Sequence, residues 1–531
     1  MRVASLFETG PGDGDRVLAD RRAVLAFWVG CAVVTVGVVL HLPMFLMAKD
    51  VGYRLADMPM DMGMTIGMGL IIVGVLIAAY GLLPRKTAVA AVDLAVVHDD
   101  GPLRAAHWRL MAVIVVALVI DVMKPASLGF VLPGMRDEYG VDKMTVAWLP
   151  MAALAGTVVG SLIWGALADV YGRRASILLS SVMFVGTSIC GAMPDFWWNV
   201  AMCFLMGAAA GGMLPVAYAL LAETMPLRHR GWNLVLVGGL GGIGGYLAAS
   251  GLSALLQPLY GWRIMWLLNL PTGLILVFLN GQIPESPHFL LLRGRLREAE
   301  RTLARFGAAL TRGAEGTPAS KGGETHFLSG RTLALTVTAL AWSFTNFGLL
   351  LWLPAELTAR GMDVVVSSRL LAASALIACP TIAVAALLYF RWSTKWTLAL
   401  MIVVAIAGLG GVMRLGDGAG LLDVVAPVAL LIVGSNGILA VLLPYTAENY
   451  AVGLRGRATG WVAGCSKAGG LVTQCLAIAA LVPGLGTLAL AICGLMAASL
   501  LLVIYFGSET RVGRRDADPP STAAAVETSG A

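Results

Sequence analysis

Long apolar runs separated by short polar segments make up most of this chain. A membrane core about 30 Å thick needs roughly 20 apolar residues per helix, so each such run predicts a membrane-spanning helix. We expect about fourteen spans by this criterion, at 23–47, 62–83, 110–132, 144–166, 175–194, 197–222, 232–256, 262–281, 332–354, 370–390, 397–413, 424–447, 458–480 and 482–506. The pattern predicts an all-α integral membrane protein whose backbone hydrogen bonds are satisfied within each helix.

Composition supports the same prediction. Apolar residues make up 58% of the chain and charged residues 13%, and the mean hydropathy is +0.83, which is too apolar for a soluble protein of this length. The first run begins after residue 22, is longer than the apolar part of a signal peptide and lacks a convincing cleavage site, so we expect an uncleaved helix. The seven cysteines contain no CxxC pair and predict neither disulfides nor a zinc site.

Arginine and lysine gather on one set of alternating loops, which indicates the cytoplasmic side and places both termini there. The residues on this side include Arg21, Arg22, Arg85, Lys86, Arg104, Arg173, Arg174, Arg228, Arg230, Arg391, Lys395, Arg455, Arg457, Arg511, Arg514 and Arg515. The opposite loops carry few basic residues and at least as many acids. The net charge of +6 is therefore a topology signal and does not indicate nucleic acid as a partner.

A polar decapeptide, Gly165-Ala-Leu-Ala-Asp169-Val-Tyr-Gly172-Arg173-Arg174, separates the fourth and fifth spans. It resembles the loop between the second and third helices of the major facilitator superfamily, a large group of secondary transporters. The resemblance implies a twelve-helix core with two further helices at the N-terminus. It also implies that Asp169, Arg173 and Arg174 gate the cytoplasmic face.

The chain repeats itself at an interval of about 220 residues. Leu132-Pro133 corresponds to Leu353-Pro354, and the segment 223–231 corresponds to 448–456. Such repeats place a substrate near the bilayer midplane between two halves that rock against each other. The expected organisation is an N-terminal segment at 1–22, an extra hairpin at 23–84, a linker at 85–107, a six-helix half at 108–281, an amphipathic cytoplasmic linker at 282–330, a second six-helix half at 331–507 and a disordered tail at 508–531.

The linker between the halves and several charged loop residues add to the family resemblance. The Pro284–Pro287 stretch resembles the sugar-porter branch and its relatives, which include aromatic-acid symporters. The helix expected after it has apolar residues on one side and arginines on the other, which is typical of a helix on a membrane surface. The acids and bases that resemble the family's charge-relay elements are Glu223, Arg230, Glu448, Arg455 and Arg457. The alternative is that these are ordinary loop charges that follow the topology rule.

Three ionisable residues lie about halfway along spans, namely Asp121, Lys124 and Lys467. Each costs roughly 2.5–3.5 kcal/mol at a helix centre, so each needs a reason. Asp121 and Lys124 share a helical face and form either a structural ion pair or a switchable carboxyl suited to proton transfer. Lys124 and Lys467 come from opposite halves, and we expect them to bracket a substrate carboxylate. Alternatively, Lys467 snorkels or pairs with Asp121.

Neutral polar residues in the spans are weaker candidates for substrate contact, because most such residues bond neighbouring helices. They are Tyr218, Tyr246, Trp342, Asn346, Ser435 and Asn436, of which Asn346 and Asn436 are favoured. The fourth core helix lacks the arginine of sugar porters at 203–207, and the seventh lacks their Gln-Leu-Ser motif, which disfavours a sugar. Trp352-Leu-Pro354 and Lys467-Ala-Gly-Gly look more like the organic-acid symporters.

The leading hypothesis is a carrier that moves a small organic anion by proton-coupled symport. We expect a monomer in a bacterial cytoplasmic membrane, with the substrate, protons and the bilayer as partners, with no cofactor and no enzymatic activity. The alternatives are transport of a sugar, polyol or other metabolite, a non-transporting membrane sensor, and copper handling by the extra hairpin. Thioethers suit Cu(I), and the hairpin offers His41, Met58, Met60, Met62 and Met64.

Overall fold

The computed structural model describes residues 21–83, 94–98, 101–312, 327, 329–414, 421–450 and 452–510. Twelve helices in this part of the chain are long and apolar enough to cross a membrane. The two remaining expected spans correspond to α11 (Ile264–Leu267) with α12 (Asn269–Asn280), which is short but apolar, and to α21 (Val452–Ile478), which carries Lys467. The all-α membrane architecture predicted from the sequence is therefore confirmed.

The first six-helix half begins at α4 and ends at α12. Before α11 and α12, its helices are α4 (Ala105–Tyr139), α5 (Lys143–Val146), α6 (Trp148–Tyr171), α7 (Arg173–Gly186), η3 (Thr187–Ala192), α8 (Phe196–Ala210), α9 (Met213–Thr224) and α10 (Leu227–Tyr260). Short breaks divide several spans into two helices. The expected spans are recovered because each apolar run can satisfy its backbone in lipid only as helix.

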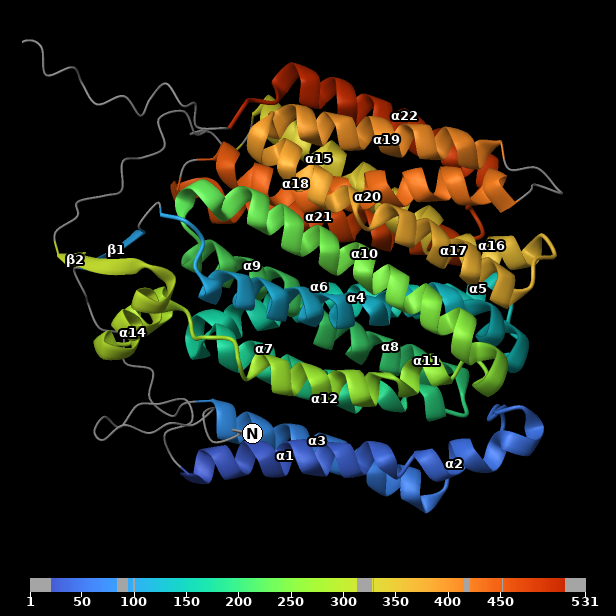
Figure 1. The fold of residues 1–531 in the computed structure, drawn as a ribbon. Helices are drawn as coiled ribbons and strands as arrows, with labels where there is room; N and C mark the ends of the chain where they lie inside the picture. The colour runs from blue at the N-terminus through green and yellow to red at the C-terminus, as the bar shows by residue number, and fades with distance from the viewer. Residues whose placement is uncertain are drawn as a thin grey trace, which may run out of the picture.

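The second half repeats this arrangement from α15 to α22. Its helices are α15 (Gly330–Ser343), the π-helix η4 (Phe344–Leu350), α16 (Leu353–Ala359), α17 (Val364–Ala378), α18 (Thr381–Arg391), α19 (Thr394–Met413), α20 (Leu421–Asn449), α21 and α22 (Leu485–Phe506). The halves meet where α10 packs against α17, α18 and α20, where α21 lies beside α6, and where α16 lies beside α4. Figure 1 shows the two halves as adjacent layers of roughly parallel helices.

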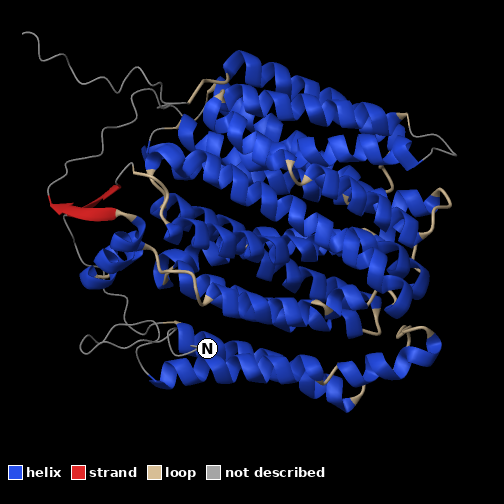
Figure 2. Cartoon of the chain, viewed as in Figure 1, coloured by secondary structure: helices blue, strands red, loops and turns tan. Residues whose placement is uncertain are grey.

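Both ends of the described chain lie at the same end of the bundle, which we call the termini side (Figure 1). The amphipathic helix expected in the linker is α14 (Leu296–Phe306), preceded by α13 (Pro287–Leu292). It buries Ala299, Leu303 and Phe306 and exposes its arginines, as expected. One element was not expected. β1 (Leu94–His98) and β2 (Ala308–Arg312) form an antiparallel pair beside α14, and they are the strands seen in Figure 2.

The extra N-terminal helices form a tight hairpin of α1 (Arg21–Val39) and α3 (Met62–Leu82), joined by α2 (Leu42–Met47) and η2 (Ala48–Val51). Glycines let the two backbones touch: a Cβ on Gly30 would lie 2.5 Å from the backbone nitrogen of Ala78. Such small-residue contacts are a usual way of packing helices in lipid. The hairpin packs on α7, so it lies on the face of the first half that is remote from the second half (Figure 1).

A buried carboxylate fixes the hairpin loop to the first half. Oε1 of Glu138 accepts hydrogen bonds from the backbone N–H groups of Leu55 at 2.7 Å and Ala56 at 3.0 Å. The same atom lies 2.7 Å from the guanidinium of Arg263, and Oε2 accepts from the indole of Trp262 at 2.7 Å. The side chains of Glu138 and Arg263 are 4% and 0% exposed. This network makes the hairpin part of the first half rather than a separate appendage.

The expected segments 1–20, 313–326 and 511–531 lie outside the described residues, as does most of the linker at 85–107 apart from β1 and residues 101–107. The boundaries drawn from the sequence therefore remain predictions.

Candidate functional site

Asp121 and Lys467 are ionisable residues on helices of opposite halves of the bundle. Asp121 lies on α4 and is 6% exposed, and Lys467 lies on α21 and is half-buried. Both Lys467 and Lys124 lie close enough to Asp121 to act on its charge. No ion pair within 4.0 Å joins Asp121 to either lysine in the described part of the chain. The two groups are thus within electrostatic range but without direct contact.

Lys124 does not take the position expected of it. Its side chain is completely buried, and its ammonium donates to the backbone carbonyl of Phe184 at 3.1 Å and to the hydroxyl of Thr187. It also lies 4.0 Å from the centre of the Phe184 ring. Spacing along α4 allowed a pair with Asp121, but the carbonyl and hydroxyl on α7 and η3 supply better-placed acceptors. The structure therefore shows no direct Asp121–Lys124 ion pair, which was one of the two alternatives, and the role of Lys124 in substrate binding stays a prediction.

Both central helices are irregular beside the charged residues. Pro125 lies inside α4 and has no N–H, so the carbonyl of Asp121 loses its intrahelical partner. In the second half, the π-helix η4 contains Asn346 and Phe347. Isolated π-turns and broken spans occur frequently at functional sites, because they aim backbone and side-chain groups that a regular helix cannot.

The internal repeat shows that the acid and the base occupy non-equivalent positions in the two halves, an arrangement that we call the diagonal of Asp121 and Lys467. The register that aligns Leu132-Pro133 with Leu353-Pro354 aligns Asp121 with Trp342. The register that aligns segments 223–231 and 448–456 aligns Lys467 with Gly242. Each charged residue thus has a neutral counterpart in the other half.

An aromatic pair lies beside Lys467. Its ammonium lies 5.4 Å from the centre of the Phe347 ring, and Phe347 contacts Trp342 edge to face at 5.7 Å. Gly469 and Gly470 allow this approach, since a Cβ on Gly470 would lie 2.7 Å from the Phe347 ring. A cation with aromatic walls can recognise a flat anion through charge and stacking together.

Several neutral candidates carry polar atoms without partners. The indole N–H of Trp342, the hydroxyl of Ser435 and the hydroxyl of Tyr246 are buried and form no hydrogen bond within the described part of the structure. Buried polar atoms of this kind are rare and call for an explanation such as ligand binding. Asn436 donates to Ile432 at 3.1 Å, and its oxygen lies against Gly242. These groups come from both halves and keep their candidacy.

The charged loop residues on the termini side form a network within the first half and the linker. Arg173 donates to Asp169 at 2.8 Å and to Glu223 at 3.3 Å, and Arg174 donates to the carbonyl of Gly281 at 2.9 Å. The carboxylate of Glu285, a residue that the sequence analysis did not assign, accepts from the backbone N–H of Arg173 at 2.8 Å.

Glu285 lies at the N-terminus of α7, where backbone N–H groups and the helix dipole favour an anion. Burial nevertheless raises the pKa of Glu285 above the ordinary value for a glutamate, and the hydrogen bonds from Ser286, Arg174 and Arg173 act in the opposite direction. The signal in the sequence was its place in the Pro284–Pro287 stretch. Its partner in the fold could not be read from that stretch.

Other gating candidates contact the second half. Glu448 accepts from the hydroxyl of Tyr389 at 2.7 Å and lies against Gly231 at the start of α10, so it touches both halves. Arg457 stacks over the Phe327 ring at 4.6 Å. Arg230 lies at the start of α10, next to the Gly231 that Glu448 contacts. The side chain of Arg455 falls outside the described residues.

The methionines of the hairpin do not gather on one surface. Met64 is buried and Met62 is 79% exposed, while Met58 and Met60 are half-buried in the core of the first half. His41 is buried, and its Nδ1 hydrogen-bonds the Gly37 carbonyl at 2.8 Å. These positions follow helix packing, so nothing in their arrangement favours the copper hypothesis over the packing of a membrane hairpin.

The comparison with known proteins decides the family. The sequence model of the Major Facilitator Superfamily matches residues 110–474. The chain belongs to this family. The match begins within α4 and ends within α21, so it covers most of the two six-helix halves and leaves the N-terminal hairpin and α22 outside it.

Relatives of this facilitator are transporters. It is 26% identical to the niacin transporter NiaP of Acinetobacter baylyi over 393 residues, and this match covers 71% of this chain and 88% of that protein. It is 32% identical over 222 residues to the 4-hydroxybenzoate transporter PcaK of Pseudomonas aeruginosa, over 41% of this chain and 49% of that protein. The proton:xylose symporter XylE shares the fold, with a TM-score of 0.61 and 15% identity over 77% of this chain and 97% of XylE.

Proposed function

We propose that this facilitator imports a small organic anion together with a proton, and that the anion is an aromatic monocarboxylate. The observation that carries the proposal is the diagonal of Asp121 and Lys467, an acid on α4 and a base on α21 in opposite halves, with Pro125 near the acid and the π-helix η4 beside the base. The relatives named for niacin and 4-hydroxybenzoate transport support the class of cargo. The positive-inside pattern supports a carrier with both termini on the cytoplasmic side of the membrane.

The coupling follows from the cost of unpaired charge in a membrane. When the carrier is empty, the carboxylate of Asp121 balances Lys467, so the halves can rock. A bound substrate carboxylate needs Lys467 for itself, which leaves Asp121 as an uncompensated anion. A proton on Asp121 removes that charge. The loaded centre is therefore balanced only when one proton and one anion bind together, which is symport.

Transport assays on Asp121→Asn test the proton step. In the empty variant Lys467 has no anion to balance it, so the return of the empty carrier is disfavoured while exchange of bound anion continues. We expect uptake driven by a pH gradient to be lost and exchange of labelled benzoate or nicotinate in proteoliposomes to persist. Full proton-driven uptake by Asp121→Asn would contradict the proposal.

A comparison of two buried lysines tests the anion site. Lys467→Gln removes the cation on the diagonal and should abolish binding of benzoate and nicotinate at the central site, and with it their transport. Lys124→Met is the matched control, because Lys124 bonds only groups of its own half in the described structure. Loss of binding in both variants to the same extent would restore the two-lysine clamp expected from the sequence.

A further inference from the structure

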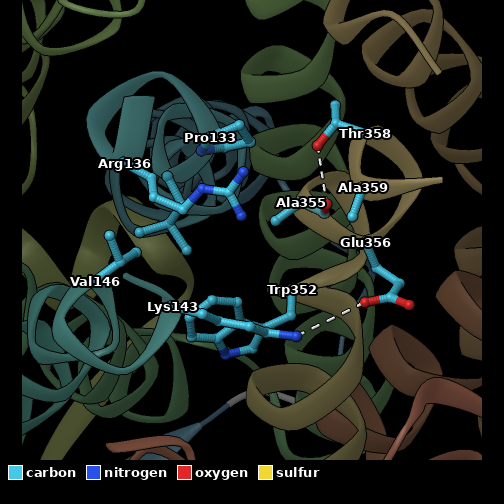
Figure 3. Close-up of a pocket in the computed structure, with 10 residues that line it drawn as sticks. Pro133, Arg136, Lys143, Val146, Trp352, Ala355, Glu356, Thr358 and Ala359 are labelled. Carbon is cyan, nitrogen blue, oxygen red and sulfur yellow. Dashed lines mark hydrogen bonds and ion pairs between the residues drawn. The ribbon is translucent and has the colours of Figure 1, made fainter. Parts of the chain in front are cut away.

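The ends of the two halves enclose a cavity of about 50 Å³ on the side opposite the termini. The first half contributes Pro133 and Arg136 from α4 and Lys143 from α5, and the second half contributes Trp352 and Glu356 (Figure 3). This cavity is remote from the diagonal of Asp121 and Lys467, since α4 places Arg136 four turns beyond Asp121. It is open to the side that the charge pattern assigns to the exterior.

A weak ion pair across this cavity connects the halves. Nζ of Lys143 lies 3.8 Å from Oε2 of Glu356, and the two side chains are 63% and 26% exposed. Glu356 is also 3.6 Å from Nε of Arg360. These distances exceed those of good hydrogen bonds, so the pair is one that a competing ion can displace. Arg136 adds a second cation to the lining, and its guanidinium also lies 3.5 Å from the carboxylate of Asp137.

The wall of the cavity is connected to the central site. The ammonium of Lys143 lies 5.9 Å from the centre of the Trp352 ring. The indole of Trp352 donates to Gln474 at 3.2 Å, and the amide of Gln474 donates to the carbonyl of Phe347 at 2.9 Å. Phe347 belongs to the π-helix and faces Lys467. A change at the cavity therefore reaches the central residues through two hydrogen bonds.

We propose that this cavity is an outer binding site for an organic carboxylate, in which the ligand's carboxylate takes the place of Glu356 beside Lys143 and Arg136 and so releases the contact between the halves. The ligand presents the same group as Glu356, so the competition is between chemically equal anions. The inference rests on the proposed function, because the ligand it names is the transported anion. It adds a second site and a way for substrate to favour the outward-open state.

The size of the cavity limits what it holds. A cavity of about 150 Å³ accommodates benzene, whereas this one measures about 50 Å³. It fits a carboxylate group and leaves the ring of an aromatic acid at the mouth, next to Trp352. The site therefore captures the anion without enclosing it.

Two variants that break the same ion pair separate this proposal from a purely structural one. Glu356→Gln removes the competing anion and keeps both cations, so the KM for benzoate or nicotinate uptake by whole cells should fall by about two- to fivefold. Lys143→Gln removes the cation that both anions use, so the KM should rise by about the same factor. Arg369→Gln, which removes an exposed cation at the start of α17, is the matched control and should leave the KM unchanged.

The direction of the two changes decides the outcome. Opposite shifts in KM for Glu356→Gln and Lys143→Gln support the outer site. Shifts in the same direction, or no shift in either, overturn it, because a contact that only holds the halves together would respond alike to the loss of either partner.

Equilibrium binding of labelled benzoate and nicotinate to the purified proteins separates this inference from the proposed function. If the wild type binds neither probe, the proposed function fails and the outer site fails with it. If Lys467→Gln abolishes binding while Lys143→Gln and Glu356→Gln both bind and transport as the wild type does, only the outer site is refuted.

Discussion

Replacing Glu138 by glutamine should destabilise the protein far more than its position near a helix end suggests. The carboxylate is 4% exposed and its partner Arg263 is 0% exposed. Four donors converge on it, namely the N–H groups of Leu55 and Ala56, the indole of Trp262 and the guanidinium of Arg263. The amide of glutamine keeps one acceptor oxygen and loses the charge, so Arg263 becomes a buried cation without its anion.

The magnitude follows from the cost of breaking a buried pair on one side only. Such changes reduce the free energy of unfolding by about 3–5 kcal/mol. Carbonyls of Gly191 and Met193 still accept from Arg263, at 3.1 and 2.9 Å, which favours the lower end of that range. The neighbouring Asp137 is the matched control: its side chain is 65% exposed and lies 3.5 Å from Arg136. An exposed pair of this kind is worth less than about 1 kcal/mol.

Reversible unfolding in mixed micelles, followed by circular dichroism, measures both variants under the same conditions. Glu138→Gln should lose at least about 2 kcal/mol more than Asp137→Asn. The double variant Glu138→Gln, Arg263→Met should recover part of the loss, because it leaves no unpaired buried charge. Equal stabilities of Glu138→Gln and Asp137→Asn would refute the conclusion that this carboxylate anchors the hairpin loop.

Three further predictions concern other contacts. Gly129→Leu places a side chain where a Cβ would lie 2.4 Å from the carbonyl of Leu351, so overpacking of about 1–3 kcal/mol should hold the halves apart and increase maleimide labelling of a cysteine placed at 355. Arg173→Lys keeps one contact of the three-way guanidinium bridge and should lower the maximal uptake rate, whereas an unchanged rate would remove Arg173 from gating. Burial raises the pKa of Glu285, so the stability that its protonated carboxyl contributes is complete below about pH 4.3 and declines as pH rises through the raised pKa. Glu285→Gln should therefore make the melting temperature less dependent on pH between pH 4 and 8.

The sequence singles out the candidate residues of the central site by the free-energy cost of an ionised group in a membrane span. Asp121 and Lys467 stand out because an ionised group in a membrane span is expensive wherever the helix lies. Sequence spacing also suggested that Asp121 pairs with Lys124, and the structure shows why spacing was insufficient. A helix position restricts a side chain to a face, but the acceptors that compete for it come from other helices, here the Phe184 carbonyl and Thr187.

Residues that meet across the bundle escaped prediction. Lys143 and Glu356 looked like ordinary loop charges, since a pair separated by more than 200 residues leaves no local pattern. Glu138 and Glu285 likewise gained their partners only by folding. The strand pair β1 and β2 was missed for the same reason, because its two strands lie in linkers on either side of the first half.

The sequence by itself determined that this protein is a membrane bundle and which few polar residues carry a free-energy cost that needs a function. It could do so because lipid leaves a backbone only one choice within each apolar run. Tertiary structure alone decided that Lys124 bonds the Phe184 carbonyl and Thr187, that the hairpin is fixed through Glu138, and that Lys143 meets Glu356 at the outer cavity. The physical reason is that donors and acceptors on several helices compete for each side chain. The spacing of apolar residues along one helix does not specify which helices will pack against it.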